Sequence, residues 1–205
     1  MIKGYYFITD EKCSVNGNQS DVEQAVAGGA RIVQYRNDMA PLREVLEEAQ
    51  GLIRLCTNTL FIINNRVDVA LAVDADGVHI GQDDLPLATA RRILGKKKII
   101  GVTVHTLEEA LAAQKGDASY VAVSPIFSTK TKKDAGKPVG LKLLSIVKDA
   151  VSIPVVAIGG ITIDNVPEVI AAGADAVCAI SAVVAHKDVK ARVNQFQELF
   201  SKKRR

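Results

Sequence analysis

The sequence predicts an α/β protein, a single (β/α)8 barrel of the TIM type with parallel strands, over residues 1–205. Short runs rich in Val, Ile, Phe and Tyr alternate with longer segments of helical periodicity along the whole chain, which predicts parallel strands joined by helices. An open doubly wound sheet also fits this alternation. Eight units within 205 residues, at about 25 residues per unit, favour closure into a barrel instead.

The eight predicted strands share a content of Val, Ile, Phe or Tyr that suits buried strands. In chain order they occupy residues 5–10, 31–36, 60–64, 77–81, 99–104, 120–126, 155–160 and 176–182. The segments between them leave room for helical crossovers, so each strand is expected to run parallel to its neighbours.

Amphipathic segments between the strands predict an outer ring of helices. The segment 42–55 carries apolar residues at 42, 45, 46, 49, 52, 53 and 55, as a helix with one buried face would. A second helix is predicted over 107–114, with Thr106 as its N-cap. Helices repeatedly end in Ala- or Gly-rich corners just before a strand, at residues 27–30, 73–76, 115–118 and 172–175. This weak repeat supports the count of eight units.

The longest connection between a strand and its helix runs over residues 127–140 and is polar and basic, with Gly and Pro. This composition is typical of a loop that covers an active site. Lys130, Lys132 and Lys133 alternate with threonines and either bind an anionic group or form a solvated charged loop. Under the first of these alternatives, Lys130 and Lys132 are the predicted substrate contacts.

The composition is that of a folded globular protein, because 48% of the residues are hydrophobic and 24% are charged, which excludes intrinsic disorder. The net charge of +3 is spread along most of the chain, so nucleic acid is not an expected partner. The basic run at residues 202–205 is interpreted as a solvated end. Neither a signal peptide nor a membrane-spanning stretch is apparent, so we expect a cytoplasmic protein without a membrane partner.

Cys13, Cys56 and Cys178 are an odd number of cysteines at wide spacing, which predicts reduced structural thiols and neither disulfides nor a zinc site. The sequence leaves the oligomeric state open, a homo-oligomer included.

Polar residues follow the predicted strands, at the end of a barrel where active sites lie. Gly159 and Gly160 end the seventh strand and allow backbone N–H groups to approach an anion, with a helix predicted from Asp164 behind them. Ile180 and Ser181 are predicted to end the eighth strand and to add N–H groups and a hydroxyl. A Gly pair alone also serves an ordinary tight turn, but beside this barrel pattern it predicts a phosphate site.

Four further residues near the strand ends have less specific patterns. Asp83 and Asp84 either hold Mg²⁺ or cap the helix that follows them. His79 lies in an apolar run and is interpreted as a packed core residue, whereas His105 lies at a strand end without an evident orienting partner.

Seven short segments have a specific pattern and together carry a resemblance to one family. They are residues 6–10, 34–36, 64–70, 77–86, 129–132, 157–160 and 180–181, reading YFITD, QYR, NNRVDVA, GVHIGQDDLP, TKTK, AIGG and IS. With these segments the chain resembles the thiamine phosphate synthases, also called thiamine-phosphate pyrophosphorylases, over nearly its full length.

The resemblance implies a transferase of thiamine biosynthesis with two small-molecule substrates. A hydroxymethylpyrimidine diphosphate would lose Mg²⁺-bound diphosphate, and the nitrogen of a thiazole phosphate would capture the resulting pyrimidine cation to give thiamine phosphate. The task of the protein in such a reaction is mainly positioning and charge stabilisation.

The same resemblance assigns residues to each part of the site. The residues implied to contact the pyrimidine diphosphate are Gln34, Arg36, Asn64, Thr103 and Lys132. Those implied to hold the thiazole phosphate are Thr129, Thr131, Gly160, Ile180 and Ser181. Lys132, Thr103 and Arg36 are the predicted catalytic residues, and Asp84 is the predicted Mg²⁺ ligand.

Two positions depart from the pattern of the family. Its second-strand motif ends in Lys where this chain has Asp38, and its third-strand Asn-Asp pair is Asn64-Asn65 here. The first change replaces a diphosphate-binding cation by an anion, and the second replaces a carboxylate by an amide, which is a poorer ligand for Mg²⁺. Because neighbouring strands lie about 4.8 Å apart, Asp38 is predicted to supply the missing carboxylate, so that Asp84, Asn65 and Asp38 form the metal site.

The alternative is that these two changes have removed synthesis. The barrel would then be a thiazole tautomerase-like relative, or a non-catalytic protein that binds a phosphorylated ligand. The intact segment 130–132 and Asp84 argue against the tautomerase interpretation.

Overall fold

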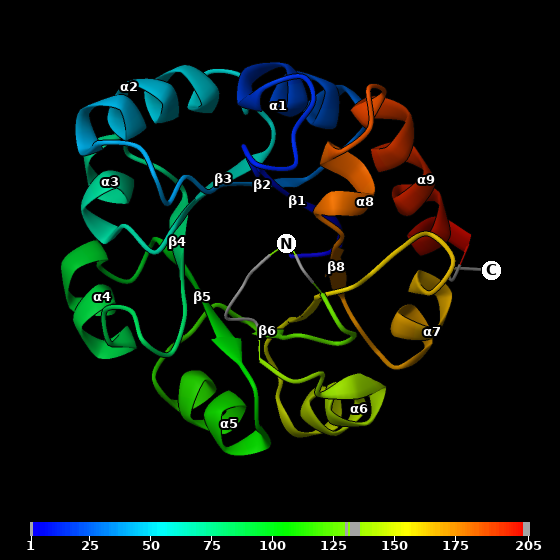
Figure 1. The fold of residues 1–205 in the computed structure, drawn as a ribbon. Coiled ribbons are helices and arrows are strands. Elements are labelled where there is room, and N and C mark those ends of the chain that lie inside the picture. The colour runs from blue at the N-terminus through cyan, green and yellow to red at the C-terminus, as the bar shows by residue number, and fades with distance from the viewer. Residues whose placement is uncertain (1, 130, 132–135, 203–205) are drawn as a thin grey trace.

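The computed structural model describes residues 2–129, 131 and 136–202, and it shows a closed barrel of eight parallel strands in the order β1-β2-β3-β4-β5-β6-β7-β8. The helices form a ring outside the barrel (Figure 1). The predicted (β/α)8 barrel is therefore confirmed. Pairing between β1 and β8 closes the sheet and excludes the open doubly wound arrangement.

Strands and helices alternate along the chain. The strands are β1 (Gly4–Ile8), β2 (Ile32–Tyr35), β3 (Leu60–Asn64), β4 (Gly77–Ile80), β5 (Ile99–Val104), β6 (Tyr120–Val123), β7 (Val155–Ile158) and β8 (Ala176–Cys178). The helices are α1 (Asn18–Ala27), α2 (Leu42–Ile53), α3 (Val67–Ala72), α4 (Leu87–Leu94), α5 (Leu107–Lys115), α6 (Gly140–Ala150), α7 (Val166–Ala171), α8 (Ser181–Val184) and α9 (Val189–Lys202).

All eight predicted strands are present, but two of them end clearly earlier than predicted. β6 stops at Val123 because the segment that follows contains Pro125, which has no N–H to donate to a ladder. β8 stops at Cys178, and the prediction that it continues through Ile180 and Ser181 is wrong. Ile180 has helical dihedral angles, and α8 begins at Ser181.

The helix predicted to begin at Asp164 starts later, because a turn precedes it. The N–H of Thr162 donates to Oδ1 of Asn165 at 2.8 Å, and α7 begins at Val166. The predicted N-cap at Thr106 is confirmed, since its hydroxyl oxygen accepts the N–H of Glu109 at 3.2 Å.

Two apolar layers fill the molecule. In β1, Tyr5 and Phe7 belong to the layer between strands and helices, whereas Tyr6 and Ile8 point into the barrel, as the two-residue period of a strand requires. The interior layer is therefore built from alternate residues of several strands.

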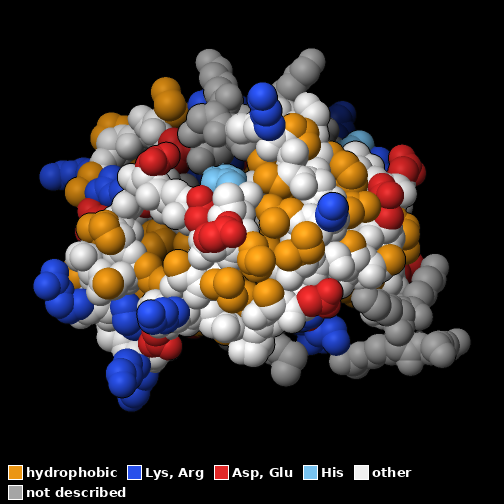
Figure 2. Space-filling model, turned by 90° about the horizontal axis from the view of Figure 1, so that it is seen from below, with side chains coloured by type: hydrophobic (Ala, Val, Ile, Leu, Met, Phe, Trp, Pro, Cys, Tyr) orange, Lys and Arg blue, Asp and Glu red, His pale blue; other side chains and the backbone are white. Residues whose placement is uncertain are grey.

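The outer surface mixes apolar and charged side chains. On the face seen in Figure 2, hydrophobic side chains gather in the middle between scattered charges of both signs. Leu111 of α5 and Ile146 of α6 are among the exposed large hydrophobic residues. Such exposure is ordinary for a folded protein. Within the described part of the chain, no helix combines the length and the apolar character needed to cross a membrane.

Candidate active site

A cavity of about 420 Å³ opens where the loops after β6, β7 and β8 meet. Its wall brings together predicted site residues that are far apart in the sequence. They are Arg36, Thr129, Thr131, Gly159, Gly160, Ile180 and Ser181. The predicted phosphate site and one predicted contact of the pyrimidine diphosphate therefore share a single cavity.

The glycine pair after β7 is required by the local backbone. Gly159 and Gly160 have φ values of 104° and 63°, a region that side chains with a Cβ rarely adopt. A Cβ at Gly160 would lie 2.5 Å from the carbonyl oxygen of Ser128, and one at Gly159 would lie 2.5 Å from Cβ of Pro125. The glycines thus let the turn after β7 pack directly on the loop after β6, while Asn165 Nδ2 donates to the Gly160 carbonyl at 2.9 Å.

Small hydroxyl side chains supply much of the polar lining beside this turn. Ser128, Thr129 and Thr131 line the cavity from the loop after β6, and Ser181 lines it from the start of α8. The predicted substrate contacts Lys130 and Lys132, together with Lys133, lie outside the described residues.

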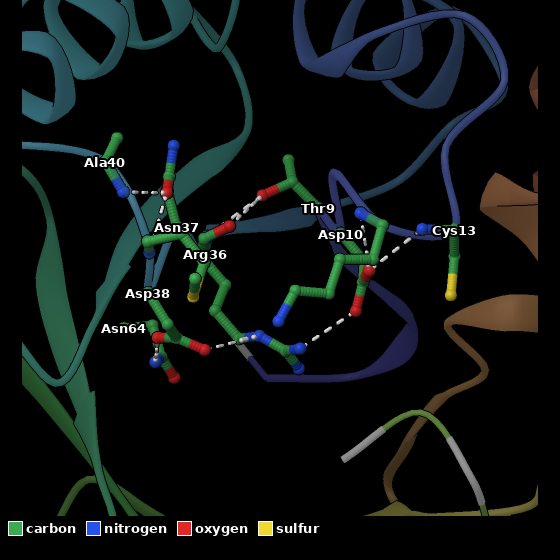
Figure 3. Close-up of polar contacts among 10 residues, drawn as sticks. Thr9, Asp10, Cys13, Arg36, Asn37, Asp38, Ala40 and Asn64 are labelled. Carbon is green, nitrogen blue, oxygen red and sulfur yellow. Dashed lines mark hydrogen bonds and ion pairs between the residues drawn. The ribbon is translucent and has the colours of Figure 1, made fainter. Parts of the chain in front are cut away.

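Arg36 follows β2 and is held between two carboxylates (Figure 3). Its Nη2 lies 2.8 Å from Oδ2 of Asp10, and its Nε lies 3.2 Å from Oδ2 of Asp38. The side chain of Asp10 is 2% exposed, whereas that of Asp38 is 50% exposed. The guanidinium is therefore fixed on a buried side and accessible from the side of Asp38.

Asp10 is a site residue for which the sequence predicted no role. Its Oδ1 accepts the N–H groups of Lys12 and Cys13, each at 3.1 Å, which leaves Oδ2 directed at Arg36. Thr9 completes the arrangement, because its hydroxyl accepts the N–H of Arg36 at 2.9 Å and donates to the carbonyl of Arg36 at 3.2 Å. The sequence signal that could have indicated Asp10 is its place at the end of the YFITD segment, two residues after the last residue of β1.

Asp38 lies beside two residues predicted to contact the diphosphate. Besides its ion pair with Arg36, it accepts a long hydrogen bond of 3.4 Å from Nδ2 of Asn64. Lys12, which was not predicted, lines the same small notch as Arg36 and Asp38. A cation from the loop after β1 thus lies near Asp38, the position at which the family motif has a Lys.

Asn65 and Asp84, the other two predicted metal ligands, both occupy turns. Asn65 has a φ of 59°, which Asn and Asp adopt more readily than other side chains, and its N–H donates to the carbonyl of His79 at 2.8 Å. Oδ2 of Asp84 accepts the N–H of Gly81 at 2.7 Å, so Asp84 closes a turn after β4. It does not cap α4, whose N-cap position is Pro86. The described residues contain no group of three or more His, Cys, Asp or Glu side chains suited to a metal.

The two histidines near the strand ends make more specific contacts than predicted. His79 is buried, as expected, but its ring nitrogens lie 2.9 Å from the Tyr120 hydroxyl and 2.8 Å from the Thr103 hydroxyl. His105 does have an orienting partner, contrary to the prediction, because its Nδ1 lies 2.7 Å from the carbonyl oxygen of Ser124. Long-range contacts of this kind leave no local sequence signal.

Comparison with known proteins identifies this barrel. A family profile described as thiamine monophosphate synthase matches residues 5–183. The chain belongs to the thiamine monophosphate synthase family. The resemblance inferred from the seven sequence segments is confirmed, and the chain is an enzyme of thiamine biosynthesis.

Similar members of the family cover nearly the whole chain. A thiamine-phosphate synthase from Methanosarcina barkeri is 50% identical over 202 residues, which make up 98% of this chain and 92% of the relative. One from Chloroflexus aurantiacus is 49% identical over 199 residues, 96% of this chain and 92% of the relative. The solved structure of a thiamine phosphate pyrophosphorylase from Pyrococcus furiosus is 39% identical, covers 97% of this chain and 96% of its own, and has a TM-score of 0.90.

Two of the three cysteines line the cavity of this thiamine monophosphate synthase family member. Cys13 reaches it from the loop after β1 and Cys178 from the end of β8, whereas Cys56 is buried elsewhere; all three are free thiols. Burial raises the pKa of the Cys178 thiol well above its ordinary value, so this group stays protonated and neutral in the wall.

Proposed function

We propose that this mouth joins a hydroxymethylpyrimidine diphosphate to a thiazole phosphate, giving thiamine phosphate and diphosphate. One observation carries the proposal: a single cavity is lined both by Arg36, from the pyrimidine diphosphate half, and by Gly160 and Ser181, from the thiazole phosphate half. The two substrates must meet in one cavity because the C–O bond to diphosphate breaks and the new C–N bond to the thiazole forms at the same carbon of the pyrimidine substrate.

The thiazole phosphate would lie in the turn after β7. Gly159 and Gly160 have no side chains that would cover this turn, so an anion can approach its peptide N–H groups. Ile180 and Ser181 would add backbone and hydroxyl donors from the start of α8, and Thr129 and Thr131 would add hydroxyls from the loop after β6.

The diphosphate would lie beside Arg36, with Gln34, Asn64 and Lys132 as further contacts. Since Asp10 fixes the guanidinium from its buried side, a phosphate group can approach the exposed donors without reorganising the side chain. Asp38 competes with the diphosphate for Arg36 in the free protein, and Lys12 supplies a nearby positive charge.

Asp84, Asn65 and Asp38 would hold Mg²⁺ at this half of the mouth. The donor set suits the ion, because Mg²⁺ is often bound by one or two carboxylates and completes its coordination with water and phosphate oxygens. The half-exposed Asp38 carboxylate is accessible for this role. When bound, Mg²⁺ would neutralise charge on the diphosphate group.

The protein would contribute orientation and charge to the reaction. Arg36 and Lys132 would stabilise the departing diphosphate. Thr103 would orient the pyrimidine, so that the thiazole nitrogen reaches the cationic carbon that diphosphate has left. All three act on groups whose charge or position changes during the reaction, which makes them the proposed catalytic residues.

An assay of the purified chain with both substrates, with and without Mg²⁺, tests the proposal. We expect thiamine phosphate to form in a Mg²⁺-dependent manner. Tight binding of thiazole phosphate without any turnover, with both substrates and Mg²⁺ present, would contradict synthesis and favour a non-catalytic binding barrel.

A further inference from the structure

A chain of hydrogen bonds crosses the interior of the barrel beneath the mouth. Gln34 Nε2 donates to the Tyr6 hydroxyl at 2.9 Å, and the Tyr6 and Tyr120 hydroxyls lie 2.7 Å apart. The Tyr120 hydroxyl lies 2.9 Å from His79 Nδ1, and His79 Nε2 lies 2.8 Å from the Thr103 hydroxyl. Both ends of this chain, Gln34 and Thr103, are residues assigned to the pyrimidine substrate.

The sheet register creates room for this chain. His79 of β4 pairs with Gly101 of β5, and Gly101 pairs with Tyr120 of β6, so the three residues form one row across the barrel wall. A Cβ at Gly101 would lie 2.0 Å from the Tyr120 ring. Because Gly101 has none, the Tyr120 ring stacks on the His79 ring, with centroids 5.6 Å apart and an interplanar angle of 23°.

The hydrogen bonds in this chain run in one direction from donor to acceptor, because the Gln34 amide nitrogen at its start can only donate. Burial raises the pKa of Tyr6 and of Tyr120 above the ordinary value, so both hydroxyls keep their hydrogens. Tyr6 accepts from Gln34 and therefore donates to Tyr120. Tyr120 in turn donates to His79 Nδ1, and the hydrogen on His79 Nε2 is donated to Thr103.

The other neutral tautomer of His79, with its hydrogen on Nδ1, leaves one buried hydroxyl without a hydrogen-bond acceptor. A hydrogen on Nδ1 would make Tyr120 donate to Tyr6, which would then accept from both Tyr120 and Gln34. The hydrogen of Tyr6 would have no acceptor among the contacts of the described residues, and buried donors are rarely left in this state.

We propose that this directed chain holds His79 as the neutral Nε2–H tautomer, so that Thr103 donates its hydroxyl hydrogen to an acceptor atom of the pyrimidine. His79, Tyr6 and Tyr120 are then positioning residues, and Thr103 selects a ring that presents a hydrogen-bond acceptor to the half-buried end of β5. The identity of the ring rests on the proposed function, but the direction of the chain does not.

The tautomer can be measured on the protein without substrates. In protein labelled with ¹⁵N-histidine, the shifts and couplings of the ring nitrogens distinguish the two tautomers and the imidazolium. His105→Gln and His186→Gln assign the other two of the three histidines. We expect Nε2–H at His79 near neutral pH, and the Nδ1–H tautomer or an imidazolium would overturn the proposal.

Replacing the donor at residue 34 by an acceptor tests the direction of the hydrogen-bond chain. Gln34→Glu places an acceptor of similar shape at the start of the chain, so Tyr6, Tyr120 and His79 Nδ1 would each donate toward residue 34. We expect His79 to change to the Nδ1–H tautomer. Asn64→Asp is the matched control, since it adds the same charge at the end of the neighbouring strand but lies outside the chain, and it should leave Nε2–H in place. An unchanged tautomer in Gln34→Glu would contradict the proposal.

The role of Thr103 is tested by binding, so that it does not depend on turnover. Thr103→Val should weaken binding of the pyrimidine diphosphate at least about tenfold, whereas Thr103→Ser should remain within about threefold. Equal affinities of the valine variant and the unmodified protein would overturn the proposed donor. An Nε2–H tautomer in a protein that makes no thiamine phosphate would refute the proposed function and support the directed chain.

Discussion

Arg36 is paired with two carboxylates whose surroundings differ. Asp10 is almost completely buried and also accepts two backbone N–H groups, whereas Asp38 is half-exposed. Breaking a buried, hydrogen-bonded pair leaves polar groups without partners, while an exposed ion pair contributes little to stability. Asp10 is thus expected to orient the guanidinium, and Asp38 to be displaced from it easily.

Asp10→Asn should leave Arg36 without its buried anion. We expect the free energy of unfolding, measured in urea, to fall by about 1–3 kcal/mol. Since a small misplacement of a binding group is costly, kcat/KM for the pyrimidine diphosphate should fall about 100-fold. Asp68→Asn, which breaks an exposed pair with Arg66, is the control and should cost less than about 1 kcal/mol. Similar losses in the two variants would show that Asp10 has no special positioning role.

Asp38→Ala tests whether this carboxylate compensates for Asn65. We expect the variant to need a higher Mg²⁺ concentration for half-maximal thiamine phosphate formation, because one oxygen ligand is lost. The double variant Asp38→Lys with Asn65→Asp restores the pattern of the family and should remain active. Full activity of the alanine variant at unchanged Mg²⁺ concentrations would refute the compensation.

At the scale of elements, the turn after β7 depends on its contact with the loop after β6. Gly160→Ala places a Cβ against the Ser128 carbonyl oxygen at a positive φ, whereas Gly95→Ala meets nothing within 4 Å at a similar φ of 72°. We therefore expect Gly160→Ala to be less stable than Gly95→Ala by at least about 1 kcal/mol in urea unfolding. Gly160→Ala should also bind thiazole phosphate more weakly in calorimetric titration. Equal stabilities and equal affinities of the two variants would contradict a role of the contact between Gly160 and Ser128.

The sequence pattern predicted every strand, but β6 and β8 end at Val123 and Cys178, where the prediction continued to residues 126 and 182. Residues 179–184 are mostly small or β-branched, so their composition suits a strand as well as a short helix. The choice is made by tertiary structure, in which the carbonyl of Ile180 accepts the N–H groups of Val183 and Val184. Similarly, the turn from Thr162 to Asn165 delays α7 through side-chain contacts that periodicity does not reveal.

At the scale of the molecule, barrel closure explains which site residues were predictable. Parallel strands place their following residues at one mouth, and this was sufficient to bring Arg36, Gly160 and Ser181 into one cavity. Contacts across the interior, such as that between Tyr6 and Tyr120, join residues 114 positions apart. They depend on register and on the space left by Gly101, so the strand pattern alone could not predict them.

The whole barrel should be stabilised by a ligand that binds only its folded mouth. Thiazole phosphate at 100 times its Kd should raise the free energy of unfolding by about 2.7 kcal/mol, which a thermal unfolding experiment detects as a higher Tm. Ser181→Ala should reduce this gain at the same ligand concentration, because a proposed phosphate donor is lost. An unchanged Tm at saturating thiazole phosphate would contradict binding at the folded mouth.

Cys13 is a native thiol at the cavity to which a fluorescent label can be attached. Cys56 and Cys178 are buried, so the half-buried Cys13 on the cavity wall is the thiol that a reagent reaches first in the native protein. Burial and the nearby Asp10 raise the pKa of its thiol, so alkylation should be slow near neutral pH and faster as the pH rises and the thiolate forms. A fluorophore attached there, beside Arg36, would turn the unmutated chain into an optical sensor of its own substrates, and bound thiazole phosphate should slow the attachment measured by mass spectrometry.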